Sequence, residues 1–269
     1  MDPQDYLDFV KELTKEAGEK TLEFYRSDYA VNEKAGGSPV TEADLESEEI
    51  LIDGLSKTEY GIVAEERGRV DRDNSRGYWI VDPLDGTQDF IDKTGEFAIM
   101  VGFLQRGEPL LGVVYAPASE KLWYATKGDG AFVVAGGDES SIEVNNKPTL
   151  VSCNLIASRN HFSQADREIS ERLHVAGITR MGSLGIKFSS IAEGRADLTY
   201  YTTDRLGIWD ACAPQAILEE AGGSVYDTNG RRPHYDLDMM RMLDGIIGLG
   251  TSDPDIKDKI VATLSEVGK

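Results

Sequence analysis

The stretch at residues 79–87 reads Trp79-Ile80-Val81-Asp82-Pro83-Leu84-Asp85-Gly86-Thr87 and combines an apolar run with two closely spaced aspartates. Its bulky and β-branched start predicts a buried strand. We expect the strand to stop at Asp82, because Pro83 has no N–H with which to extend a sheet ladder. Asp82 and Asp85 then place two carboxylates at a tight turn. Gly86 and Thr87 offer backbone amides if a helix begins near residue 88. Carboxylates hold cations and such amides hold phosphate, although an Asp-Pro turn with a helix cap fits the spacing equally well.

Two other segments also run into acidic side chains. The apolar strand Ile62-Val63-Ala64 leads into Glu65, and Trp209-Asp210 opens an amphipathic helix at about 211–221. Asp210 taken alone fits a plain N-cap. Carboxylates that converge from remote segments repel one another unless cations neutralise them, and a two-metal site for phosphoryl transfer satisfies that condition. The three acidic segments therefore suggest a shared metal site.

The composition limits the class of protein. The chain has 269 residues, 40% hydrophobic and 28% charged, which supports a packed core. Its net charge is 28 − 48 = −20, which disfavours a nucleic acid polymer as partner. The apolar runs fall short of the roughly 20 residues that a membrane span needs, and the acidic N-terminus lacks a signal-peptide pattern. We therefore expect a cytoplasmic protein with no membrane contact, in which Cys153 and Cys212 are buried thiols rather than a disulfide.

Periodicity predicts the order of helices and strands. Helices are expected at 3–26 and 42–55, followed by strands at 61–64, 78–81, 97–104, 110–115, 121–126 and 131–134. Such successive short strands favour an antiparallel meander. Later strands are expected at 154–157, 178–181, 196–201, 224–226 and 245–249, alternating with helices at 164–175, 184–193, 210–220 and from 255. We predict a mixed α/β (α+β) chain: an N-terminal α+β domain at 1–140 with an antiparallel sheet and the metal-binding motifs, and a C-terminal α/β domain at 141–269 with the substrate-selecting residues.

Paired motifs in the two halves resemble a known family. The segment 82–87, together with Trp209-Asp210-Ala211-Cys212-Ala213 and Ala221-Gly222-Gly223, is similar to the two signatures of the inositol monophosphatase family. The order and spacing fit across nearly the whole chain. The resemblance implies a layered αβαβα sandwich of the sugar-phosphatase type and lithium-sensitive, magnesium-dependent hydrolysis of phosphomonoesters. It also implies roughly two or three Mg2+ ions per site and a possible homodimer.

The resemblance assigns the metal ligands by position. Glu65, Asp82 and the Leu84 carbonyl are expected to hold one ion. Asp82, Asp85 and Asp210 are expected to hold a second, and a third, weaker ion is expected near Glu65 through water. All of these ligands are oxygen atoms, which suits magnesium.

The resemblance also assigns the residues that handle water and phosphate. Thr87, paired with Asp44 in one branch and with the Glu65 position in others, is expected to orient the attacking water and take its proton. Backbone amides of Gly86 and Thr87 are expected to hold the phosphate oxygens. Asp44 has an alternative role, because Thr41-Glu42-Ala43-Asp44 also suits a helix capping box.

Several segments are similar to the 3'(2'),5'-bisphosphate nucleotidase branch, which acts on 3'-phosphoadenosine 5'-phosphate. They are Ser38-Pro39-Val40-Thr41 before Asp44, Gln88-Asp89-Phe90-Ile91, Gly95-Glu96-Phe97, Ala157-Ser158-Arg159-Asn160-His161, and Gly182-Ser183-Leu184 before Lys187. Asn160 replaces a usual serine, and the spacing to Lys187 is inexact. The resemblance implies a small phosphorylated metabolite as partner, bound by Ser158, Arg159, His161, Gly182, Ser183 and Lys187. Inositol monophosphate and fructose 1,6-bisphosphate stay open as substrates.

Other interpretations fit parts of the pattern. Arg159 could merely end a strand, and Lys187 could face solvent on a helix. A two-metal nuclease would also cluster carboxylates, but the acidic balance counts against it. A non-catalytic phosphate-binding regulator would be marked by a lost ligand, and none of the expected ligands is missing. Cys153 and Arg159 have the spacing of a cysteine phosphatase, but the strand-like residues between them would bury the thiol.

Overall fold

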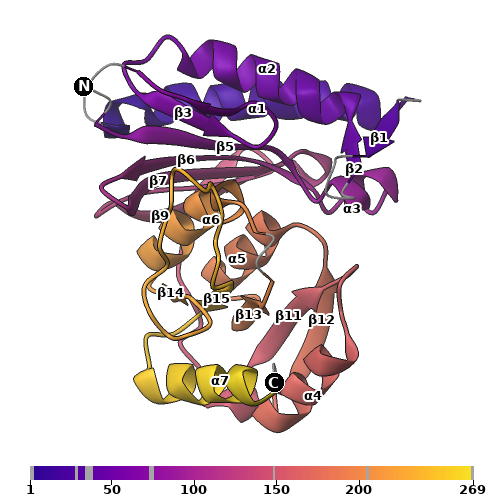
Figure 1. Cartoon of the computed structure of the whole chain (residues 1–269), viewed down its shortest axis with the longest axis vertical. Coiled ribbons are helices and arrows are strands. Elements are labelled where there is room, and N and C mark those ends of the chain that lie inside the picture. Colours follow the sequence, from indigo (N-terminus) through magenta and orange to yellow (C-terminus); the bar gives the residue numbers. More distant parts are fainter. Residues whose placement is uncertain are drawn as a thin grey trace.

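The computed structural model describes residues 3–27, 30–33, 39–72, 76–147, 149–203 and 206–267. Its elements stack in five layers, helix, sheet, helix, sheet, helix, which run from top to bottom in Figure 1. The helices of the first layer are α1 (Leu7–Tyr25) and α2 (Glu42–Leu55). The middle layer holds α5 (Leu184–Ala192) and α6 (Ile208–Glu220), and the last holds α4 (Gln164–Leu173) and α7 (Pro254–Val267). The predicted αβαβα arrangement is confirmed.

The first sheet has eight strands in the order β10-β9-β8-β7-β6-β5-β3-β4. Their bounds are β3 (Gly61–Ala64), β4 (Gly68–Val70), β5 (Tyr78–Asp85), β6 (Ala98–Gln105), β7 (Glu108–Ala116), β8 (Lys121–Thr126), β9 (Gly130–Ala135) and β10 (Asp138–Ile142). Neighbouring strands are antiparallel except for β3 and β5, which run parallel. Strands β5 to β9 form the expected meander, and β10, a strand that was not predicted, extends it past the predicted boundary at residue 140.

Strand β5 does not stop where the sequence suggested. Asp82 pairs with Met100 and Asp85 pairs with Ala98, so β5 contains one extra residue between these two pairs. The prediction of a strand end at Asp82 is therefore wrong: Pro83 lies in a bulge, which tolerates a residue without an N–H. The bulge leaves both aspartates on the same strand.

The second sheet has five strands in the order β12-β11-β13-β15-β14. Their bounds are β11 (Asn154–Ser158), β12 (Gly177–Met181), β13 (Leu198–Tyr201), β14 (Ser224–Tyr226) and β15 (Ile246–Leu249). Strand β11 is parallel to β12 and β13, whereas β15 is antiparallel to β13 and β14. A small antiparallel pair, β1 (Val31–Glu33) and β2 (Pro39–Thr41), precedes α2, and the short helix α3 (Thr87–Ile91) follows β5.

The largest apolar cluster lies between the two sheets and joins the two halves of the chain. It combines side chains of β5 to β9 with those of α5 and α6, including Trp123, Phe188 and Cys212. Separate clusters lie under α1 and α2 and between the second sheet and α4 and α7, where Cys153 is buried. Both cysteines are free and buried, as the sequence predicted.

Helix α6 approaches the first sheet closely because glycines face it. Gly102 and Gly112 are cross-strand partners on β6 and β7. A Cβ atom at Gly112 would overlap the backbone of Ala213 on α6, and one at Gly102 would overlap the Cys212 thiol. Because neither glycine has a side chain, α6 packs directly against the sheet backbone here, and this contact sets the position of the helix.

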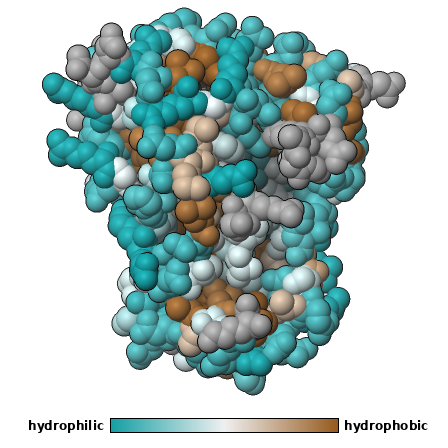
Figure 2. Space-filling model, viewed as in Figure 1, coloured by the Kyte–Doolittle hydropathy of each residue, from teal (hydrophilic) through white to brown (hydrophobic). Residues whose placement is uncertain are grey.

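The surface in view agrees with the charged-residue content of 28%. The face shown in Figure 2 is mostly hydrophilic, with limited apolar areas. None of the helices in the described ranges combines the length and the apolar character that crossing a bilayer requires.

Candidate active site

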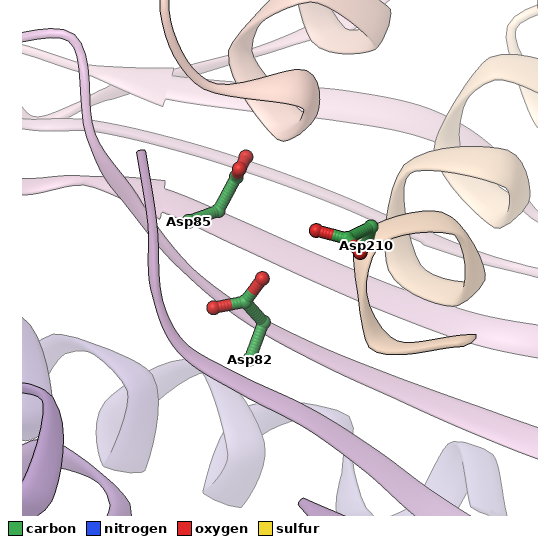
Figure 3. Close-up of side chains that lie close together, drawn as sticks. All are labelled: Asp82, Asp85 and Asp210. Atoms are coloured by element: carbon green, nitrogen blue, oxygen red, sulfur yellow. The ribbon is translucent and has the colours of Figure 1, made fainter. Parts of the chain in front are cut away.

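Three aspartates from the two signature segments meet between the sheet and α6. Asp82 and Asp85 extend from β5, and Asp210 extends from the first turn of α6 (Figure 3). One carboxylate oxygen of each lies within 4.8 Å of the other two. The convergence that the sequence could only suggest is thus present in the structure.

Asp82 is in an environment that disfavours its charge. It is 1% exposed, its Oδ1 accepts a hydrogen bond from Leu84 N at 3.0 Å, and its buried Oδ2 has no hydrogen-bond partner among the described residues. Burial raises the pKa of Asp82 well above its usual range, and the charges of Glu65, Asp85 and Asp210 raise it further. An anion in such a place needs a proton or a cation.

Asp85 is buried but well bonded on one oxygen. Its Oδ2 accepts hydrogen bonds from the Ser183 hydroxyl and from Gly185 N, the latter at 2.7 Å. Burial raises the pKa of Asp85, and these two hydrogen bonds oppose the rise. Ser183 also caps α5 by accepting a bond from Ile186 N at 3.1 Å, so this predicted substrate residue connects Asp85 to the start of α5.

Asp210 combines a cap with its place in the cluster. It is the third residue of α6, and its Oδ2 accepts a hydrogen bond from Gly207 N, the N-cap residue, at 2.6 Å. Asp210 therefore both caps α6 and belongs to the aspartate cluster. Glu65 follows β3 and lies outside the 4.8 Å group, but its charge acts on Asp82.

Thr87 and Asp44 form the pair that the resemblance implied. The Thr87 hydroxyl lies 3.1 Å from Asp44 Oδ1 and 3.2 Å from the Leu84 carbonyl oxygen. Asp44 is fully buried, and its Oδ2 accepts bonds from the N–H and the hydroxyl of Thr41 at 2.7 and 2.6 Å, which closes the capping box of α2. One oxygen of Asp44, Oδ2, thus closes the capping box, and the other, Oδ1, contacts Thr87.

Gly86 makes the turn from β5 into α3. Its φ of 92° lies in the left-handed region, and a Cβ atom there would come within 2.9 Å of the Glu96 carbonyl oxygen. Glycine is required at this position for both reasons. The turn places Thr87 at the first position of α3, next to the aspartates.

Arg159 is held by carboxylates. Its guanidinium donates to both oxygens of Glu96, at 3.1 and 2.5 Å, and lies 3.3 Å from Asp89 Oδ1. Asn160 donates to Asp89 Oδ2 at 2.9 Å, and Glu96 also accepts a bond from Gly182 N at 2.8 Å. These residues join the segment after β11, the turn before α5, helix α3 and the segment that follows α3.

Lys187 is buried and does not face solvent, so the alternative that places it on an exposed helix face is wrong. Its side chain is 0% exposed, and its Nζ has no hydrogen-bond partner among the described residues. Nζ lies 4.9 Å from the centre of the Tyr201 ring, and the Tyr201 hydroxyl donates to Ser158 Oγ at 3.2 Å. Burial lowers the pKa of Lys187 to about 8, while Asp85, Asp89 and the neighbouring acids oppose that shift.

The remaining predicted substrate residues lie at the end of β11, and Ser38 lies outside the described residues. His161 is exposed, and its N–H donates to Ser158 Oγ at 3.3 Å. Sequence reasoning gave no role to Asp89, Glu96 or Glu48, although the structure buries or bonds all three. Asp89 and Glu96 stood inside motifs already singled out, and Glu48 lies one helical turn after Asp44.

Known proteins of one family are similar to this chain in sequence and in fold. A sequence model of the inositol monophosphatase family matches residues 2–269. The chain belongs to the inositol monophosphatase family. It is similar to the 3'(2'),5'-bisphosphate nucleotidase CysQ of Escherichia coli K12, with 35% identity over 238 residues that cover 85% of this chain and 93% of CysQ. It is also similar to the inositol-1-monophosphatase of Mesorhizobium japonicum, with 33% identity over 210 residues, 77% of this chain and 78% of the relative.

A solved structure agrees with the family at the level of the fold. The extragenic suppressor protein SuhB of Bartonella henselae superimposes with a TM-score of 0.84 at 26% identity, covering 97% of this chain and 99% of SuhB. The resemblance to the inositol monophosphatase family is confirmed over the full chain. This member of the family is thus a phosphatase, as predicted.

Proposed function

We propose that this phosphatase is a magnesium-dependent phosphomonoesterase that hydrolyses 3'-phosphoadenosine 5'-phosphate to AMP and phosphate. The observation that carries the proposal is the Asp82, Asp85 and Asp210 cluster, with a buried Asp82 oxygen that receives no hydrogen bond from any residue that the structure describes. The choice of a nucleotide rests on the 35% identity to CysQ of E. coli, which is named a 3'(2'),5'-bisphosphate nucleotidase.

The side chains fit a magnesium site. Magnesium prefers carboxylate oxygens, and an unbonded, buried carboxylate oxygen among other carboxylates suits a cation. Glu65, Asp82 and the Leu84 carbonyl would hold one ion, and Asp85 and Asp210 would join Asp82 for a second. A third, weaker ion would lie near Glu65. When bound, such ions bring the pKa of water toward about 7 and stabilise the departing oxygen.

Thr87 and Asp44 would prepare the water. A hydroxyl has one donor and two acceptor sites, so Thr87 can donate to Asp44 Oδ1 and accept from a water. As the water oxygen bonds to phosphorus and the ester P–O bond breaks, the water proton would pass to Thr87 and the Thr87 proton to Asp44. The departing oxygen would take a proton from solvent. Amides at Gly86 and Thr87 would hold the phosphate oxygens.

The surroundings of Lys187 favour the proposal that the substrate is an anion. A buried ammonium without a hydrogen-bond partner in the described structure suits a phosphate group, which would supply acceptor oxygens. Ser158, His161, Gly182 and Ser183 would complete this side of the site. Arg159 is already paired with Glu96 and Asp89, which favours a second candidate, an inositol monophosphatase that needs no cation for a second phosphate.

The test is a phosphate-release panel. Wild-type enzyme with Mg2+ would be assayed on 3'-phosphoadenosine 5'-phosphate, inositol monophosphate and fructose 1,6-bisphosphate, and the nucleotide should give the highest kcat/KM. Chelation of the metal or added lithium should suppress turnover. Asp82→Asn should abolish turnover while the protein stays folded, and Asp53→Asn, an exposed site on α2 with the same loss of charge, should leave it unchanged.

Two results would overturn the proposal. If the nucleotide is the poorest substrate, the nucleotidase assignment is wrong and the second candidate takes its place. If Asp82→Asn retains magnesium-dependent turnover, the assignment of the metal site is wrong. A homodimer and a cytoplasmic location stay predictions, the first from the resemblance and the second from the sequence.

A further inference from the structure

Glu48 is a buried carboxylate one turn after Asp44 on α2. It is 2% exposed, and both of its oxygens accept hydrogen bonds from consecutive backbone amides. Its Oε2 accepts from Glu66 N at 2.8 Å, and its Oε1 accepts from Arg67 N at 3.0 Å. A carboxylate is well suited to this task because it has only acceptor sites.

The two amides belong to the loop that carries Glu65. Residues 65–67 join β3 to β4, and Ala64 and Gly68 are paired on either side of the loop. Glu65 N donates to the carbonyl of Val81 at 3.3 Å, and Val81 immediately precedes Asp82. All three amides of the loop are therefore bonded, one to β5 and two to Glu48, and this fixes the backbone of Glu65 relative to Asp82.

Burial of Glu48 is costly, because a buried carboxylate loses its hydration. In the loop that it holds, Glu65 and Glu66 are half-buried and only Arg67 is exposed. Burial accordingly raises the pKa of Glu48, with the two backbone bonds opposing the rise. The feature that distinguishes this loop is that its first residue, Glu65, lies beside the aspartate cluster.

We propose that Glu48 is a positioning residue of the metal site: by holding the amides of Glu66 and Arg67, it sets where Glu65 can meet a magnesium ion. This inference rests on the proposed function, because it assumes that Glu65 is a metal ligand. Glu48 would act only through Glu65. Outer partners that orient metal ligands commonly change metal affinity by about 10- to 100-fold when they are removed.

The experiment measures Mg2+ binding by calorimetry on the whole chain without substrate. The variants are Glu48→Gln, Glu65→Gln, the double variant, and Asp82→Asn. Glutamine keeps one acceptor oxygen but places an NH2 group against the second amide. Glu49→Gln is the matched control, because it removes the same charge from the exposed neighbour on α2. Thermal unfolding of each metal-free variant checks that it folds.

Glu48→Gln should weaken Mg2+ binding by about tenfold, and Glu49→Gln should not change it. In the Glu65→Gln background, the Glu48 change should have no further effect, because a residue that acts only through Glu65 gives a non-additive double-mutant cycle. If Glu48→Gln does not fold, Glu48→Asp serves instead: it keeps both oxygens on a shorter chain and should weaken binding less than Glu65→Gln does.

The outcomes separate the inference from the proposed function. If the wild type does not bind Mg2+, or if Asp82→Asn binds it as tightly as the wild type, the proposed function fails. If those two behave as proposed but the Glu48 variant matches the Glu49 control, only the inference is overturned. Additive effects of the Glu48 and Glu65 changes also overturn it.

Discussion

At the scale of single residues, the surroundings of Asp82 in the metal-free site disfavour its ionised form. The side chain is buried, one oxygen lacks a hydrogen bond among the described residues, and Glu65, Asp85 and Asp210 add like charge. A raised pKa means that the folded chain holds a proton more tightly than the unfolded chain, whose aspartates titrate near about 3.9. Function and stability therefore oppose each other at this position.

This opposition predicts how Asp82→Asn changes stability with pH. As pH rises above about 4 and through the raised pKa, the metal-free wild type loses the proton and with it part of its free energy of unfolding. Asparagine cannot ionise and still offers an acceptor to Leu84 N, so the variant should become the more stable protein as pH rises. Denaturant unfolding at about pH 5 and about pH 8, with chelator present, measures the difference.

Added magnesium should reverse that order. It should raise the Tm of the wild type and leave the variant nearly unchanged, because a ligand stabilises only the folded state that binds it. A metal-free Asp82→Asn variant that is less stable than the wild type at both pH values would contradict this account. For a chain of this size, each kcal/mol of change in the free energy of unfolding shifts Tm by roughly 2–4 °C.

The sequence predicted which acidic residues lie together better than it predicted their surroundings. Asp82, Asp85 and Asp210 could be chosen because apolar segments led into or followed each of them, and Thr87 with Asp44 followed from the resemblance. The burial of Lys187 could not be predicted, because α5 lies between two sheets and all of its residues, polar ones included, are buried. The pairing of Arg159 with Glu96 joins residues 63 positions apart, and no local pattern indicates it.

At the scale of elements, the position of α6 decides where Asp210 lies. The helix begins two residues before Asp210 and is fixed against β6 and β7 by the glycine pair Gly102 and Gly112. The sequence placed a helix there but gave no sign of how closely it packs. The bulge in β5 was missed for the same reason, since it depends on the register with β6.

Gly112→Ala should therefore disturb both packing and metal binding. The added Cβ would meet the backbone of Ala213, so α6 must shift, at a cost of about 1–3 kcal/mol. The shift would move Asp210 and weaken Mg2+ binding. Gly177→Ala is the control, because the nearest atom there is the end of the flexible Asn154 side chain. Urea unfolding and calorimetry measure both effects, and wild-type values for Gly112→Ala would refute the role of the glycine pair.

At the scale of the whole molecule, the two halves share their main core. Helices α5 and α6 come from the second half of the chain, yet their apolar side chains complete the inner face of the first sheet. Strand β10 also runs past the predicted boundary at residue 140. We propose that the divisions 1–140 and 141–269 describe two parts of one cooperative unit rather than two domains that fold alone.

Whether the two halves unfold together can be measured through the two buried cysteines. Cys212 lies in the core shared by the halves, and Cys153 lies in the cluster between the second sheet and helices α4 and α7. Burial raises the pKa of both thiols, to about 11 for Cys153, so an alkylating reagent should reach them only when the protein opens.

Labelling across a urea series, read by mass spectrometry at each cysteine, then follows each layer separately. One cooperative unit predicts the same urea midpoint for both cysteines, and separate midpoints would show that the core shared by the halves and the outer core of the second half open independently. The protein thus contains two natural reporters of its own opening, one in the core that the halves share and one in the outer core of the second half.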